Sequence, residues 1–431
     1  MITFSKSIFR SSLLTLLAAG CSSAPNSTAT DSGVTVEAGT DAAPTTYDDT
    51  ALDGPKWVVN AVDCGCKTLG EKNDIPSSCN TSVSPNTIRV HAIDLDATGD
   101  SASEISGGLE VIACRGLAYS DRSATTTTTL DLYLPKDYLA SDKPRPVVMY
   151  THGGGWWSGS SADVTPQQLA YLAKGYAVVS TNYRLSCYTY PSDPTNPPDY
   201  QHACTARDPN DPQWVKFPEN LKDLKTAIQW MGLKLPDIVD TSRLIAWGFS
   251  AGGHLSALLG TTDGVAGLEG RAGSAVSSKV SAAVVQSPAV DLDYFAHPTA
   301  PQHIGPGIDQ DPDYPRPNGC PENDDWFNSA IAIRTMVGAE ISPPTPQSLL
   351  ATPTTNLDAN DAPLYMLIGS CDATVAYKGN VDWAQQHGSS VLGSNYHFEV
   401  AVGAQHGGTF SIPGVWSRVR DFIYDKAPPN K

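Results

Sequence analysis

Short apolar runs alternate with helix-like stretches from about residue 130 onward, and this alternation limits the folds open to the chain. The apolar runs are rich in β-branched and aromatic residues, as in PVVMYTH at 146–152 and YAVVSTNY at 176–183. Helical patterns lie between them, as in PENLKDLKTAIQWMG at 218–232. This spacing predicts an α/β fold in which a mostly parallel central sheet carries helices on both faces. Active sites of such sheets gather at the carboxyl ends of the strands.

One serine lies where such a site is expected. The stretch LIAWGFSAGGHL places Ser250 in a G-x-S-x-G frame, with Gly248 and Gly252 on either side. A strand pattern precedes the frame and a helix pattern follows it, which predicts a nucleophile elbow, a sharp strand-to-helix turn that exposes a serine. The backbone crowds this turn, so small residues are required on both sides. We expect His254, one helical turn further on, to be a packing residue.

A glycine triplet follows the strand pattern at 146–152, and it predicts the loop that completes the oxyanion hole beside this elbow. In the α/β-hydrolase arrangement, one oxyanion-hole N–H comes from the residue after the nucleophile, here Ala251, and another from an HGGG-type loop. Glycine has no Cβ, so the amides of Gly153 and Gly154 can face the site without side chains in the way. A flexible turn is the alternative interpretation of the triplet.

The nucleophile needs a base, and the base needs a group that orients it. In this fold the chain order is serine, then acid, then histidine. His406 follows the strand pattern FEVAVGAQ and precedes two glycines, so we expect it in a loop at a strand's carboxyl end. Asp372 leaves the strand pattern of LYMLIGSCDATV, whereas Asp361 precedes that strand and Asp382 lies in a helical pattern. The expected catalytic triad is Ser250, Asp372 and His406.

Seven motifs in this order resemble one family of enzymes: LDLYLP, HGGGWWSGS, STNYRLS, FPENLKDLKTAIQWM, GFSAGGHLSALLG, IGSCDATV and GAQHGG. Together they resemble α/β-hydrolase esterases of the hormone-sensitive-lipase-like group, particularly the bacterial feruloyl and acetyl-xylan esterase-like branch. The resemblance covers residues 115–427 and implies the same triad and oxyanion hole. Phe249 stands where many lipase-like members have Asp. A tyrosine-rich insertion at 186–218 and the cysteine pairs described below also depart from the pattern. These departures concern the identity of the substrate and not the chemistry of the reaction.

The expected function is carboxylic ester hydrolysis through an acyl-enzyme, with no cofactor. The expected substrates are short acyl esters, or feruloyl or acetyl esters of carbohydrates. A serine peptidase of this fold and a general short-chain esterase are alternatives. A non-catalytic surface-binding protein would need a missing triad member, and none is missing. Trp156, Trp157, Tyr188 and Tyr190 are expected to contact sugar or phenolic rings, unless they pack the loops that carry them.

The cysteines predict disulfides. Eight remain when Cys21 is set aside, and an even number in an exported chain favours pairing. Clustering by region predicts Cys187 with Cys204 and Cys320 with Cys371. The four early cysteines would pair among themselves: Cys64, Cys66, Cys79 and Cys114. Their spacing does not match a zinc knuckle, so no metal is expected.

The N-terminus has the pattern of an export signal. Lys6 and Arg10 precede the apolar stretch SSLLTLLAAG, and Cys21 follows it, which resembles the lipobox of a bacterial lipoprotein. We expect residues 1–20 to be removed and Cys21 to carry lipid. The exported protein would then be anchored to a bacterial membrane, at the outer membrane or cell surface, and ordinary secretion is the alternative.

The rest of the chain divides by composition. Residues 21–54 have almost no large apolar side chains, so we expect a disordered tether. Residues 55–114 fit the strand–helix alternation poorly and are expected to form a small disulfide-tied, β-rich N-terminal extension, followed by the catalytic domain at 115–427. The net charge of −17 excludes nucleic acid and anionic lipid as partners. An ester is the expected partner, and membrane contact would come only through the N-terminal lipid.

Overall fold

The computed structural model describes the compact unit Tyr47–Lys431 over residues 87–96, 103–120, 128–139, 142–186, 214–271, 276–292, 310–311, 314–315, 320, 329–338, 343–372, 374–375, 377–411 and 414–430. Several expectations fall outside these residues: the signal at 1–20, the lipidated Cys21, the tether at 21–54, Cys64, Cys66, Cys79, Cys187, Cys204, Tyr188 and Tyr190. No helix within the described ranges is both long and apolar enough to cross a bilayer.

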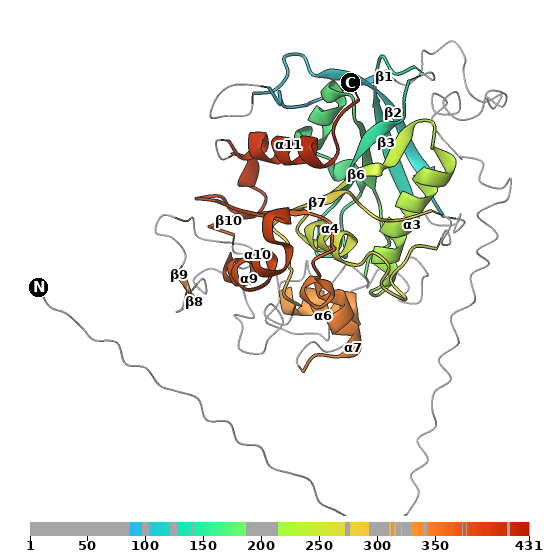
Figure 1. Cartoon of the computed structure of the whole chain (residues 1–431). Helices are drawn as coiled ribbons and strands as arrows, with labels where there is room; N and C mark the ends of the chain where they lie inside the picture. Colours follow the sequence, from blue (N-terminus) through green and yellow to red (C-terminus); the bar gives the residue numbers. More distant parts are fainter. Residues whose placement is uncertain are drawn as a thin grey trace, which may run out of the picture. The chain divides into compact units, whose positions relative to one another are not determined.

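Nine strands form the central sheet (Figure 1). They are β1 Thr87–Val90, β2 Leu109–Ala118, β3 Thr129–Pro135, β4 Arg145–Thr151, β5 Ala177–Thr181, β6 Val239–Phe249, β7 Ala282–Gln286, β10 Leu364–Gly369 and β11 Tyr396–Ala401. Their order is β1-β2-β3-β5-β4-β6-β7-β10-β11. Neighbours from β5 through β11 run parallel, and the pairs β1–β2, β2–β3 and β3–β5 are antiparallel. The expected α/β-hydrolase fold is confirmed.

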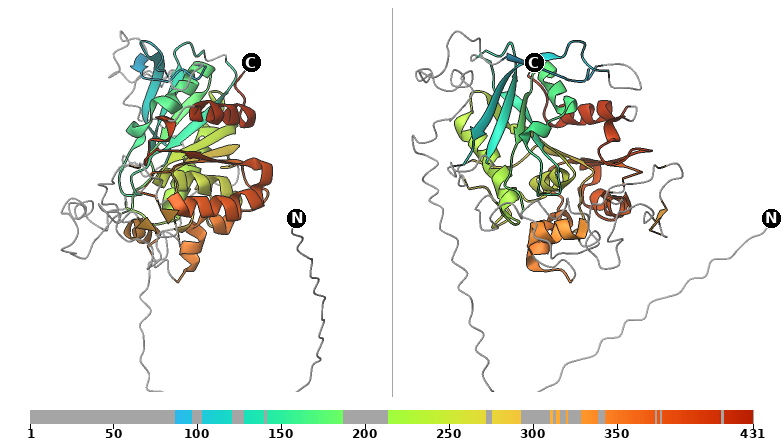
Figure 2. Two further views of the ribbon diagram at one scale, coloured as in Figure 1. Left: turned by 90° about the vertical axis from the view of Figure 1, so that its left-hand side faces the viewer. Right: turned by 180° about the vertical axis from the view of Figure 1, so that it is seen from behind.

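Helices lie around this sheet (Figure 2). The longer ones are α3 Glu219–Lys234, α4 Ala251–Thr261, α6 Ser329–Val337 and α11 Val415–Lys426. The shorter helical segments are η2 Ser161–Asp163, α2 Pro166–Leu169, η3 Ala170–Lys174, α7 Pro346–Ala351, α8 Pro353–Asn356, α9 Tyr377–Trp383, η5 Ala384–Gly388, α10 Ser389–Leu392, η6 Gly393–Asn395 and η7 Thr409–Ser411. A separate two-stranded ribbon pairs β8 Gln310–Asp311 with β9 Tyr314–Pro315.

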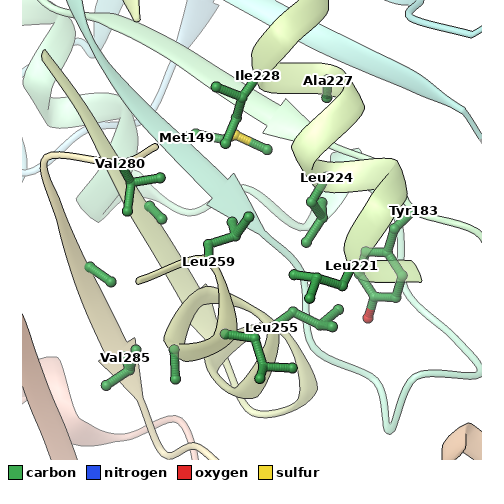
Figure 3. Packing of buried hydrophobic residues seen from close by; sticks show 14 of the residues in the cluster. Met149, Tyr183, Leu221, Leu224, Ala227, Ile228, Leu255, Leu259, Val280 and Val285 are labelled. Carbon is green, nitrogen blue, oxygen red and sulfur yellow. The ribbon is translucent and has the colours of Figure 1, made fainter. Parts of the chain in front are cut away.

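The strands build one hydrophobic core on each face of the sheet, because successive side chains point to opposite faces. In β4, Met149 belongs to the core under α3 and α4, and Val148 belongs to the core under α11. Figure 3 shows Met149 among the side chains of α3 and α4, which include Ile228 and Leu255. Burying each such side chain stabilises the fold by about 1.5–3 kcal/mol. The two cores hold the carboxyl ends of the strands in place.

Strands β1 and β2 extend the central sheet, so these two strands do not form a unit apart from it. The expected boundary at residue 115 falls inside β2, which pairs with β3 on both sides of a register shift between Cys114 and Leu117. Val111 and Ala113 of β2 are buried in a core of the hydrolase domain. The bulge interrupts the two-residue alternation of the sequence at the expected boundary, so the pattern does not show that β2 continues the sheet.

The structure contains the expected disulfide between Cys320 and Cys371. Cys114 is also disulfide-bonded, and its partner lies outside the described residues.

Candidate active site

Ser250 occupies the sharp turn between β6 and α4. Its φ of 56° and ψ of −121° are uncommon for a residue other than glycine and cost roughly 1–3 kcal/mol. Two backbone hydrogen bonds hold the turn: Ser250 N donates to Gln286 O at 2.9 Å, and His254 N donates to Ser250 O at 3.0 Å. The surrounding strands and helix therefore enforce a conformation that the residue would not adopt alone.

The glycine at position 252 is required by close packing. A Cβ on Gly252 would overlap the backbone carbonyls of Thr151 and His152 at the end of β4. Helix α4 can therefore begin beside β4 only with glycine at this position. The G-x-S-x-G frame thus reflects the crowding expected from the sequence, and it places the start of α4 next to the glycine loop after His152.

Asp372 and His406 meet at the carboxyl ends of two neighbouring strands. Asp372 follows β10, His406 follows β11, and these strands pair in parallel. The Nδ1 atom of His406 lies 2.8 Å from Oδ2 of Asp372. The other oxygen of Asp372 accepts hydrogen bonds from the amides of Thr374 at 3.1 Å and Val375 at 2.9 Å. The carboxylate is therefore fixed on both oxygens, with one of them directed at the imidazole.

Hydrogen bonds tie the two loops of this pair together. Ser370 N donates to Ala401 O at 3.1 Å, and Cys371 N donates to Ala404 O at 2.9 Å. The disulfide to Cys320 begins at the residue directly before the acid. The loops that carry the acid and the histidine are therefore held together by hydrogen bonds, and the disulfide also holds the loop of the acid.

Phe249 lies between the histidine and the glycine loop, a role that its place in the sequence did not suggest. Its ring centroid is 4.7 Å from that of His406. On the other side, a Cβ on Gly153 would lie 3.1 Å from Cδ1 of Phe249 and 3.1 Å from Cβ of Ser250. The expected nucleophile, base and oxyanion glycine therefore converge on this ring. No hydrogen bond joins the Ser250 hydroxyl to His406 within the described residues, and such bonds often tighten only when substrate is bound.

Three backbone amides were expected to form the oxyanion hole. In the described part of the chain, the amides of Gly153 and Gly154 have no hydrogen-bond acceptor. Ala251 is the first residue of α4, so its amide has no partner within the helix. Of the three expected donors, Gly153 packs against Ser250 and Ala251 follows it directly in the chain.

The two tryptophans expected to contact substrate differ in their exposure. Trp156 is only 3% exposed, and its indole Nε1–H donates to Nδ1 of His254 at 3.3 Å, so it is packed within the protein. Trp157 is partly exposed and packs against the core under α3 and α4. His254 is fully buried, as expected of a packing residue, and burial lowers its pKa to about 4. Its contact with Trp156 links the helix after the nucleophile to the loop after β4.

The described residues contain no cluster of three or more His, Cys, Asp or Glu side chains that could hold a metal ion.

The arrangement agrees with a comparison against protein families. The profile of the BD-FAE family matches residues 130–196 and 212–386, which is more than half of the chain. The chain belongs to the BD-FAE family. Ser250 and Asp372 lie within the matched ranges, and His406 lies beyond them. Membership in this esterase-like family agrees with the resemblance to lipase-like esterases stated from the motifs.

Curated relatives of this BD-FAE protein match only in part. Esterase LipC of Mycobacterium tuberculosis is 31% identical over 150 residues, which cover 34% of this chain and 30% of LipC. The non-reducing polyketide synthase mapC' of Penicillium brevicompactum is 26% identical over 198 residues, which cover 44% of this chain and 8% of the synthase. The chain therefore spans less than a third of the length of either relative.

Solved structures share the fold. A truncated form of a carbohydrate esterase from gut microbiota has 20% identity and a TM-score of 0.53, and the match covers 73% of this chain and 96% of that one. Thermogutta terrifontis esterase 2 phosphonylated by sarin has 20% identity and a TM-score of 0.50, and covers 75% and 97%. Both likenesses support the α/β-hydrolase fold.

Proposed function

We propose that this BD-FAE protein hydrolyses carboxylic esters with Ser250 as nucleophile, His406 as base and Asp372 as the group that orients the base. The observation that carries the proposal is the 2.8 Å hydrogen bond from His406 Nδ1 to Asp372 Oδ2, beside the turn that holds Ser250. Because Asp372 accepts from Nδ1, Nε2 of His406 is left as the basic nitrogen.

The reaction then follows from the placement of these groups. Ser250 Oγ attacks the ester carbonyl carbon while His406 Nε2 takes the hydroxyl proton. The carbonyl oxygen becomes an oxyanion that accepts hydrogen bonds from the amides of Gly153, Gly154 and Ala251. Collapse of this intermediate breaks the bond to the alcohol, which receives the proton from His406, and an acyl-enzyme remains. Water, deprotonated by His406, then releases the acid and restores Ser250.

The substrate class belongs to the same proposal: short acyl esters, or feruloyl or acetyl esters of carbohydrates. Its support is the family, the relative named an esterase and the structural neighbour described as a carbohydrate esterase. A general short-chain esterase would use the same site. Trp157 is the expected aromatic contact that keeps some exposure among the described residues.

We also propose that the protein is exported and anchored through lipid on Cys21. The disulfide between Cys320 and Cys371 supports an oxidising compartment. Mass spectrometry of membrane-extracted protein should then find an acylated cysteine at the mature N-terminus. A mature N-terminus elsewhere would remove the anchor.

A hydrolysis screen tests the activity. It compares p-nitrophenyl esters of graded acyl length, acetylated xylan, feruloyl esters and peptide amides, with Ser250→Ala as the matched blank. We expect turnover of esters and none of amides. A fluorophosphonate probe should label Ser250, as identified by peptide mass spectrometry. A folded wild-type protein that turns over no ester and takes up no probe would contradict the proposal.

A further inference from the structure

We propose that His254 is a positioning residue for the oxyanion hole, because it fixes Trp156 and, through Trp156, the glycine loop. The inference rests on the proposed ester hydrolysis. His254 contacts neither the substrate nor the reacting atoms of the proposed reaction. It would act by holding the glycine loop in position.

The first observation is the backbone of Trp156. Its φ of 67° is one of three positive values among non-glycine residues of the described chain, and another belongs to Ser250. Such a conformation costs roughly 1–3 kcal/mol and persists only where surrounding contacts impose it. Two contacts do so here: the indole donates to His254 Nδ1 at 3.3 Å, and Trp156 O accepts from Ser186 N at 2.7 Å.

The second observation is the hydrogen-bond direction through the imidazole. Nε2 of His254 lies 2.8 Å from Ala351 O at the end of α7, and a carbonyl can only accept, so Nε2 carries the hydrogen. Nδ1 is then an acceptor, which suits the indole N–H of Trp156. Burial lowers the pKa of His254 to about 4, which keeps this neutral form near pH 7.

The third observation connects this bridge to the nucleophile. The backbone N of His254 donates to Ser250 O at 3.0 Å, so one residue bonds the elbow with its main chain and the glycine loop with its side chain. His254 therefore sets the distance between the two halves of the oxyanion hole.

The turn around Trp156 connects the position of its side chain to the position of the Gly154 peptide. The amides of Trp157 and Ser158 donate to Gly154 O at 3.1 and 3.0 Å, and this turn encloses Trp156. Donors in an oxyanion hole act at about 2.7–3.1 Å from the developing charge, and a misplacement of about 1 Å can cost roughly 100-fold in rate. A shift of Trp156 would displace the Gly154 peptide and so lower the rate of the reaction.

Two neutral variants separate the two bonds of the ring. His254→Asn places an amide oxygen near the position of Nδ1, so it can accept from Trp156 but does not reach Ala351. His254→Gln places an amide nitrogen near the position of Nε2, so it can donate to Ala351 O but leaves the indole without its acceptor. Both variants remove the same buried ring, and the shorter Asn leaves the larger cavity, so a purely structural role would harm His254→Asn at least as much as His254→Gln.

We expect His254→Gln to lower kcat by roughly 10- to 100-fold with KM changed less than about threefold, and His254→Asn to stay within about fivefold of wild type. Trp156→Phe should resemble His254→Gln, and the double variant should lose little more, since the two residues act as a unit. Trp416→Phe is the matched control, because Trp416 is also 3% exposed but lies in the core under α11. This control should keep the wild-type kcat.

A readout independent of turnover is solvent exchange of the Trp156 indole N–H, assigned by its loss from the ¹⁵N spectrum of Trp156→Phe. Exchange should be slow in wild type and His254→Asn and faster in His254→Gln. Equal kcat in the Asn and Gln variants, or full kcat in folded Trp156→Phe, would overturn the proposal. Wild-type protein without esterase activity would refute the proposed function, and uniform exchange across the variants would refute the bridge itself.

Discussion

The imidazole of His406 is hydrogen-bonded at 2.8 Å to the carboxylate of Asp372, although 34 residues separate the two in the chain. The bond exists because β10 and β11 are parallel neighbours whose loops leave the sheet at the same edge. Phe249, at the end of β6, brings the same imidazole into contact with the segment that carries Ser250. This convergence of three strand ends supports predictions for individual residues.

Loss of the nucleophile should nearly abolish ester hydrolysis. We expect Ser250→Ala to lower kcat by roughly 10⁶-fold, and His406→Ala to lower it by a similar factor. The double variant should lose little more, since the two side chains perform one step together. Initial rates on p-nitrophenyl acetate measure this, with circular dichroism to verify the fold. Losses that multiply in the double variant would argue against a shared step.

Asp372→Asn should lower kcat by roughly 10⁴-fold, because the amide no longer holds His406 in the tautomer that leaves Nε2 basic. Asp361→Asn is the matched control: Asp361 precedes the same strand and accepts a hydrogen bond from Asp358 N. The control should keep the wild-type rate. If folded Asp372→Asn were as active as wild type, the acid would have to be a different residue.

Truncation of Phe249 should loosen the histidine and the glycine loop together. We expect Phe249→Ala to reduce kcat about tenfold, since the ring that packs at 4.7 Å from His406 is removed. Phe249→Leu retains apolar bulk and should lose less. Steady-state kinetics on one ester gives kcat and KM for both variants. A change confined to KM would indicate instead that the ring acts on substrate binding and does not position the histidine.

Stability should fall in mild acid because His254 is buried in its neutral form. Burial lowers its pKa from 6.5 to about 4, so between these values the unfolded chain binds one more proton than the folded chain. The stabilisation is fully present above pH 6.5 and is lost as the pH falls towards 4, by about 3 kcal/mol. Burial also lowers the pKa of His152, which acts in the same direction.

Urea denaturation at several pH values between about 7 and 4 measures this effect, with His254→Asn as the comparison because asparagine does not titrate. The free energy of unfolding should fall less steeply with decreasing pH in the variant. Parallel curves for the two proteins would show that His254 does not contribute.

Local patterns were enough to predict much of the candidate site. The strand–turn–helix pattern around Ser250 predicted the elbow because the crowding that requires Gly252 arises within that turn and at the adjacent end of β4. Asp372 and His406 were found because each directly follows an apolar strand pattern. The pairing of Cys320 with Cys371 was predicted by region.

The strand–helix alternation predicted the fold class, and the elbow frame with the chain order of acid and histidine predicted the candidate triad, since periodicity and turn chemistry are properties of neighbouring residues. The folded structure adds the contacts between distant segments. Strand order brings Asp372 to His406, pairing with β3 joins β2 to the sheet, and the indole of Trp156 reaches His254. The place of β2 in the sheet and the contact of Trp156 with His254 depend on packing between segments far apart in the chain, which the spacing of residue types does not encode.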